Sequence, residues 1–179
     1  QLDAIVNRNS IYSVPRNGSL APIELDWMSG GDFAFPFALT PDESRVICRR
    51  QRLGAPNSYE LRSAPTDGSD FASTLHAAMA TGRTVDEFQV SPDGLTVVYR
   101  ADQDLDDVFE LFHVPAEGGA APVKLNLPLG GNRDVGDYAI GADSLRVVYQ
   151  ADQDTDNTVE LYSVPLSGGA PVKLNQPLV

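Results

Sequence analysis

The sequence is short of several residue types, and each shortage excludes a class of protein. A single cysteine, Cys48, among 179 residues excludes an intrachain disulfide, and its apolar-alternating surroundings predict a small core residue. Only 13 Lys and Arg residues oppose 25 Asp and Glu residues, and a net charge of −12 would repel nucleic acid and anionic lipid. No apolar run approaches the roughly 18 residues of a membrane span, and no basic-then-apolar leader opens the chain. We therefore expect a soluble protein with no nucleic-acid partner and no membrane insertion.

Groups suited to catalysis are also scarce. The chain has two histidines, His76 and His113, and it lacks a G-x-S-x-G nucleophile motif, a glycine-rich phosphate loop and a cysteine–histidine metal cluster. His113 falls in a position that serine fills in the other copies of an internal repeat, at Ser13, Ser63 and Ser163. This position predicts an ordinary, outward-facing strand residue. We expect no catalytic residues and no enzymatic activity in this chain.

What the sequence does contain is a repeat of about fifty residues. The segment from Leu95 to Ala120 returns at Leu145 to Ala170 with 16 identities in 26 positions, including VVY, ADQD, EL, VP and GGA. The nine residues APVKLNLPL at 121–129 then return as APVKLNQPL at 170–178. Weaker copies upstream keep the same spacing, with prolines at Pro15, Pro65, Pro115 and Pro165. Four copies of one structural unit are therefore expected.

Each unit has the pattern of four short strands. Alternating or β-branched runs are bounded by Gly, Pro, Asn and Asp, and the tight turn Ser91-Pro92-Asp93-Gly94 joins the first two strands of the clearest copy. The predicted strands of this copy are 86–91, 96–101, 108–115 and 122–125, with an acidic loop at 102–107. The next copy predicts strands at 138–140, 146–151, 158–165 and 171–174, and the preceding copy at 35–39, 45–49, 58–64 and 71–75. The only stretch with helical character, 76–82, is assigned to a loop.

A period of 40 to 50 residues with four antiparallel strands is typical of a β-propeller, in which each repeat is one blade. We predict an all-β fold and a single domain over 1–179. The blades are placed at about 1–29, 33–80, 84–129 and 135–179. The first blade should lack its innermost strand, because the opening of the chain supplies only the last three strands of a unit.

The order F-x-V-S-P-D-G, V-V-Y, E-L-F-x-V-P-x-x-G-G and V-K-L-N, read from Phe88 to Asn126, resembles the TolB-type WD40-like propeller repeat. The resemblance covers nearly the whole chain and is strongest at 86–126. It implies a six- or seven-bladed ring of the bacterial envelope or the extracellular space that serves as a binding platform. It also implies a second setting, since similar blades precede the catalytic domain of prolyl-oligopeptidase-like enzymes. This chain departs from the family in having fewer blades and a longer acidic loop.

The acidic loops are the candidate metal sites. Carboxylates stand at positions 1, 3, 5 and 9 of two loops, a spacing at which hard oxygen ligands can converge on Ca²⁺. The predicted ligands are Asp102, Asp104, Asp106 and Glu110 in one loop and Asp152, Asp154, Asp156 and Glu160 in the other. Position 6 is Asp107 or Asn157, and both residue types tolerate a left-handed backbone.

A second interpretation of these loops is a solvated turn whose aspartates bind their own backbone. Clustered carboxylates repel one another without a counter-ion, which favours the cation. The weaker blade retains Glu60 but has lost every aspartate, so the three equivalent glutamates could belong to the blade rather than to a metal.

Two function classes follow. The first is a non-catalytic binding module for a protein, peptide or glycan, in the periplasm or outside the cell. The second is the propeller portion of a hydrolase whose catalytic domain lies outside this chain. An open arc of blades exposes apolar sheet faces at both ends. Either the chain is a fragment of a longer ring, which we favour, or two copies pack end to end to close a ring. In both cases we expect a dimer through the terminal blades.

Overall fold

The computed structural model describes residues 2–7, 10–15, 17–27, 34–52, 54–55 and 57–175, and all regular structure in them is β-strand. The described part of the chain contains no helix that could cross a bilayer. The strands are β1 (Leu2–Asn7), β2 (Ser10–Pro15), β3 (Ile23–Trp27), β4 (Ala34–Leu39), β5 (Arg45–Gln51), β6 (Tyr59–Pro65), β7 (Ser73–Thr74), β8 (Val85–Val90), β9 (Thr96–Leu105), β10 (Val108–Pro115), β11 (Val123–Lys124), β12 (Val135–Ile140), β13 (Arg146–Ala151), β14 (Glu160–Pro165) and β15 (Val172–Lys173).

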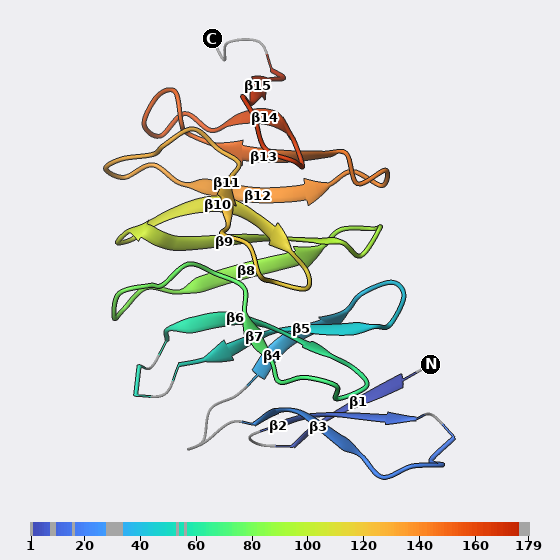
Figure 1. The fold of residues 1–179 in the computed structure, drawn as a ribbon. Coiled ribbons are helices and arrows are strands. Elements are labelled where there is room, and N and C mark those ends of the chain that lie inside the picture. The colour runs from blue at the N-terminus through green and yellow to red at the C-terminus, as the bar shows by residue number, and fades with distance from the viewer. Residues whose placement is uncertain are drawn as a thin grey trace.

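These strands form four antiparallel sheets that stack in chain order (Figure 1). The first sheet has three strands, β1-β2-β3, and the other three have four strands each. In register, β1 corresponds to the second strand of the later sheets, because Leu2 pairs with Pro15 as Arg45 pairs with Pro65. The predicted all-β fold, with three complete blades and one that lacks its innermost strand, is confirmed. Each sheet also lies within one of the predicted blade ranges.

The turn between the first two strands of a blade has the same geometry in three sheets. In the clearest copy the Gly94 amide donates to the Ser91 carbonyl at 2.8 Å, and Asp93 accepts the Leu95 amide at 3.0 Å. The last turn residue has a positive φ, which glycine adopts without strain at Gly94; Glu43 and Ser144 adopt it in the other copies. The turn residues recognised in the sequence therefore fix where each hairpin reverses.

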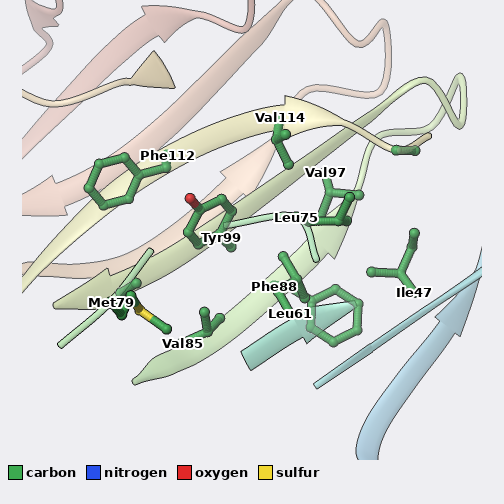
Figure 2. Close-up of a cluster of buried hydrophobic side chains, with 12 residues drawn as sticks. Ile47, Leu61, Leu75, Met79, Val85, Phe88, Val97, Tyr99, Phe112 and Val114 are labelled. Carbon is green, nitrogen blue, oxygen red and sulfur yellow. The ribbon is translucent and has the colours of Figure 1, made fainter. Parts of the chain in front are cut away.

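Neighbouring sheets pack through two unlike faces. The face toward the following sheet, here called the leucine face, consists of three aliphatic side chains: Ile47, Leu61 and Leu75 in the second sheet and Val98, Leu111 and Leu125 in the third. The opposite face, here called the aromatic face, consists of Val97, Tyr99, Phe112 and Val114 in the third sheet and Val147, Tyr149, Tyr162 and Val164 in the fourth. Figure 2 shows the leucine face of the second sheet against the aromatic face of the third.

Alternation along the strands creates both faces from one sequence run. Val97 and Val98 are adjacent in β9 and point to opposite sides, and both are completely buried. The rings of Tyr99 and Phe112 stack with centroids 5.4 Å apart, as do those of Tyr149 and Tyr162. Each buried side chain of this size contributes about 1.5–3 kcal/mol by leaving water. Cys48 is buried in the junction between the first two sheets, which confirms its prediction as a core residue.

Candidate functional site

The acidic segment 102–107 is a strand end and a tight turn, whereas the sequence predicted a loop over the whole segment. Strand β9 continues to Leu105, which pairs with Val108, so only Asp106 and Asp107 form the turn. Asp107 has φ 55°, as expected for the left-handed position. In an extended strand, alternate side chains share a face but lie roughly 7 Å apart. Asp102 and Asp104 therefore do not converge as ligands in a compact loop would.

The first aspartate of each cluster is a structural acceptor. Asp102 and Asp152 are buried, with 3% and 8% of their surface exposed. Asp102 Oδ1 accepts the backbone amide of Thr84 at 2.6 Å, and Asp152 Oδ1 accepts that of Asp134 at 2.8 Å. Each carboxylate thereby holds the residue that precedes the innermost strand of its own blade.

The third and ninth positions share a lysine. Lys124 Nζ lies 2.9 Å from Asp104 Oδ2 and 2.6 Å from the buried Glu110 Oε2. In the fourth sheet Lys173 pairs in the same way with Asp154 and with the buried Glu160. Burial disfavours the charged form of Lys124, but the hydrogen bonds and charges of Glu110 and Asp104 outweigh it and raise its pKa. The counter-ion that the clustered carboxylates require is therefore supplied by the chain itself.

The fifth position faces outward. The Asp106 side chain is 70% exposed, and its Oδ1 lies 3.2 Å from Arg83 Nε; Asp156 is also exposed. Within the ranges that the structure describes, no group of three or more His, Cys, Asp or Glu side chains is placed to hold a metal ion. The donor set does not fit Ca²⁺, because the first carboxylate of each cluster binds a backbone amide and the third and ninth share a lysine.

The glutamate at position 9 belongs to the blade. In the second sheet, where the aspartates are absent, Glu60 lies 3.4 Å from both Arg50 and Arg62. A cation therefore neutralises this glutamate in each of the three complete blades, although the partner changes from arginine to lysine. These three ion pairs favour the interpretation in which the glutamates belong to the blade rather than to a metal.

The histidines lie between sheets or in a loop. His113 is half-buried, and its position faces the following sheet rather than solvent: the equivalent Ser63 donates across the junction to the Ala116 carbonyl at 2.6 Å. The outward orientation predicted for this position is therefore wrong. Burial lowers the pKa of His113 and of His76. Among the described residues, neither ring is joined by a hydrogen bond or ion pair to a serine, cysteine or carboxylate.

The sequence predicted exposed apolar faces at the ends of the arc but did not identify the residues that form the one on the fourth sheet. Leu161 and Leu174 of the fourth sheet are 36% and 50% exposed, whereas the equivalent Leu111 and Leu125 of the third sheet are fully buried by their neighbour. A pocket of about 300 Å³ opens beside them, lined by Gln150, Val159, Glu160, Leu161 and Asn175. The repeat itself was the signal that could have found this surface.

No family model and no curated protein matches the sequence. Solved structures match the fold. A structure described as TolB from Agrobacterium tumefaciens superposes with a TM-score of 0.56 at 14% identity, over 98% of this chain and 58% of that one. The chain is a partial β-propeller.

Peptidase structures match the partial propeller equally well. A puromycin-hydrolyzing peptidase of Mycobacterium tuberculosis has a TM-score of 0.63 at 17% identity, over 98% of this chain and 27% of that one. The tricorn protease has a TM-score of 0.62 at 16% identity, over 98% of this chain and 16% of that one. The partial propeller thus spans less than two thirds of each of these proteins. The likeness at such identities concerns the fold.

Proposed function

We propose that the partial propeller is a non-catalytic module that binds a protein, peptide or glycan. The observation that carries the proposal is the leucine face of the fourth sheet, where Leu161 and Leu174 stand exposed beside a pocket. At the two preceding junctions the equivalent residues are covered by another sheet. Apolar surface of this kind, rimmed by polar groups, is typical of interaction sites.

Binding through this face is tested with a double variant, Leu161→Glu with Leu174→Glu. Arrays of extended peptides and of glycans are probed with the native chain, with the double variant, and with Leu145→Glu as a control. Leu145 is 66% exposed but lies in a turn away from the pocket. The native chain and the control should bind the same array members, and the double variant should lose them. Identical binding by all three proteins would place the function elsewhere.

The cellular location that we propose is the periplasm or the extracellular space. The fold likeness to TolB supports it, together with the resemblance of the repeat. Detection of the native protein in the cytoplasmic fraction alone would contradict this location.

The alternative function is that of the propeller portion of a hydrolase. The fold likeness to a puromycin-hydrolyzing peptidase and to the tricorn protease favours it. Both proposals predict that the purified chain does not hydrolyse peptide or ester substrates, so that assay does not separate them. A native gene product that carries a separate nucleophile-containing domain would favour the hydrolase.

A further inference from the structure

At each covered junction between complete blades, one backbone amide reaches across to the next blade. The Tyr59 amide donates to Thr84 Oγ1 at 2.9 Å, and the equivalent Phe109 amide donates to Asp134 Oδ1 at 2.7 Å. Thr84 and Asp134 occupy the same place, immediately before the innermost strands β8 and β12. The junction therefore recognises a side-chain oxygen at a fixed position of an extended segment.

At the junction between the third and fourth sheets, an arginine donates hydrogen bonds to the backbone that follows the acceptor Asp134. Arg100 donates to the carbonyls of Val135 and Gly136, at 3.3 and 3.0 Å, and stacks over Phe109 at 5.7 Å. In the preceding junction Arg49 stacks over the Tyr59 ring at 4.5 Å. The side chains of Val85 and Val135, the residues that follow the acceptors, are buried at these two junctions.

The two junctions thus share a recognition pattern. An Asp or Thr accepts an amide, and the next residue is a buried valine. An arginine lies against the residues that follow the acceptor, but its contacts differ: Arg100 donates to the carbonyls of Val135 and Gly136, whereas Arg49 Nη1 lies 3.9 Å from Asp86 Oδ1. The segments that satisfy it are Thr84-Val85-Asp86 and Asp134-Val135-Gly136.

The fourth sheet has residues at the equivalent positions, but no following sheet in the described part of the chain covers them. Val159 is equivalent to Phe109, Gln150 to Arg100 and Leu161 to Leu111, and these three residues line the 300 Å³ pocket. The Leu161 amide donates to Asn175 Oδ1 at 2.7 Å, as that of Leu111 donates to Asn126 at 2.8 Å, so the local frame is preserved. Within the described residues, the Val159 amide has no acceptor.

We propose that this pocket binds an extended segment of a partner protein that carries Asp or Thr followed by Val, in the manner of an innermost blade strand. The acceptor side chain meets the Val159 amide, the valine packs against Leu161, and the Gln150 carboxamide donates to the carbonyl that follows. Gln150 is neutral where the other junctions carry arginine, so an acidic third residue is not required. This inference rests on the proposed binding function and names its site and its ligand.

A second copy of this chain does not supply such a segment. Its first sheet has three strands in the described residues and lacks the innermost one. Its own innermost strands β8 and β12 are already engaged through Thr84 and Asp134. A second copy could cover the leucine face but would leave the pocket unfilled.

The probe for this site is a labelled peptide that copies residues 133–141, Arg-Asp-Val-Gly-Asp-Tyr-Ala-Ile-Gly. Its binding to the whole chain is followed by fluorescence anisotropy, and we expect a dissociation constant below about 1 mM. Replacing the peptide's first aspartate by alanine should weaken binding at least about fivefold, as expected for loss of one hydrogen bond that leaves an amide unpaired. Leu161→Glu in the protein should weaken it at least about tenfold, and the matched control Leu145→Glu should leave it unchanged.

Two outcomes would overturn the inference. One is absence of binding at millimolar protein, and the other is equal binding of the native and alanine peptides. Peptide binding that survives Leu161→Glu would reject this site while leaving the proposed binding function intact. The peptide-side substitution keeps the test decisive if Leu161→Glu fails to fold.

Discussion

Lys124, which pairs with Asp104 and Glu110 of the acidic hairpin formed by β9 and β10, neutralises a buried carboxylate. Lys124→Met should therefore destabilise the chain by about 1–3 kcal/mol, because Glu110 would keep its charge among buried groups with only amide donors from Asn126 and Leu129. Urea unfolding measures the change. In the double variant with Glu110→Gln the loss should be smaller than the sum of the two single losses. Additive losses would show that the pair contributes nothing.

His113 gives the stability of the chain a dependence on pH. Burial lowers its pKa in the folded state below the ordinary value of 6.5, so the unfolded chain binds the proton more readily. The stabilising contribution is present above pH 6.5 and is lost as pH falls through the lowered folded pKa. His113→Ser, which installs the residue found at this position in the other blades, should flatten the change in melting temperature between pH 7.5 and 5. An unchanged slope would contradict this assignment.

At the scale of elements, the turn of the acidic hairpin depends on a left-handed residue. Asp107→Ala should cost roughly 1 kcal/mol, because φ 55° crowds a β-carbon against the backbone without the local hydrogen bonding that Asp offers. Asp107→Gly should be neutral or slightly stabilising. Thermal unfolding of the two variants side by side tests the difference. Equal melting temperatures would mean that the hairpin closes in another way.

The sequence predicts calcium binding through the two acidic clusters, but the pairing of their carboxylates with lysine argues against it. We therefore expect calorimetry at millimolar calcium to give no heat, and a chelator to leave the melting temperature unchanged. Two sites per chain, one lost in Asp104→Ala and the other in Asp154→Ala, would restore the calcium interpretation.

The sequence could predict strands and turns because both depend on neighbouring residues. Alternation placed β10 at its observed bounds, and Ser91 to Gly94 reverse the chain through their own hydrogen bonds. The partner of a carboxylate is set by residues that only the folded sheet brings together. Lys124 follows Asp104 by twenty residues, and no local pattern joins them. Yet the two copies that carry ADQD also carry VKLN, and the copy without the aspartates has STLH, so the association was visible in the repeat.

At the scale of the whole molecule, the exposed leucine face should promote self-association through the terminal blades. We expect light scattering at high concentration to report twice the chain mass of 19.2 kDa. Leu174→Lys places a charge on the exposed face and should return the monomer, whereas Leu20→Lys, which lies between strands of the first sheet, serves as a comparison. A stable monomer of the native chain would refute the predicted pairing.

The two faces of every sheet are unlike, and this gives the stack a polarity. At each of the three junctions, the leucine face of one sheet packs against the opposite face of the next sheet. Sheets therefore join in one orientation, head to tail. Such heterologous contacts lead to a closed ring when the rotation between units completes a circle, and to an open fibre when it does not. The angle between successive sheets therefore decides between a finite particle and unlimited growth.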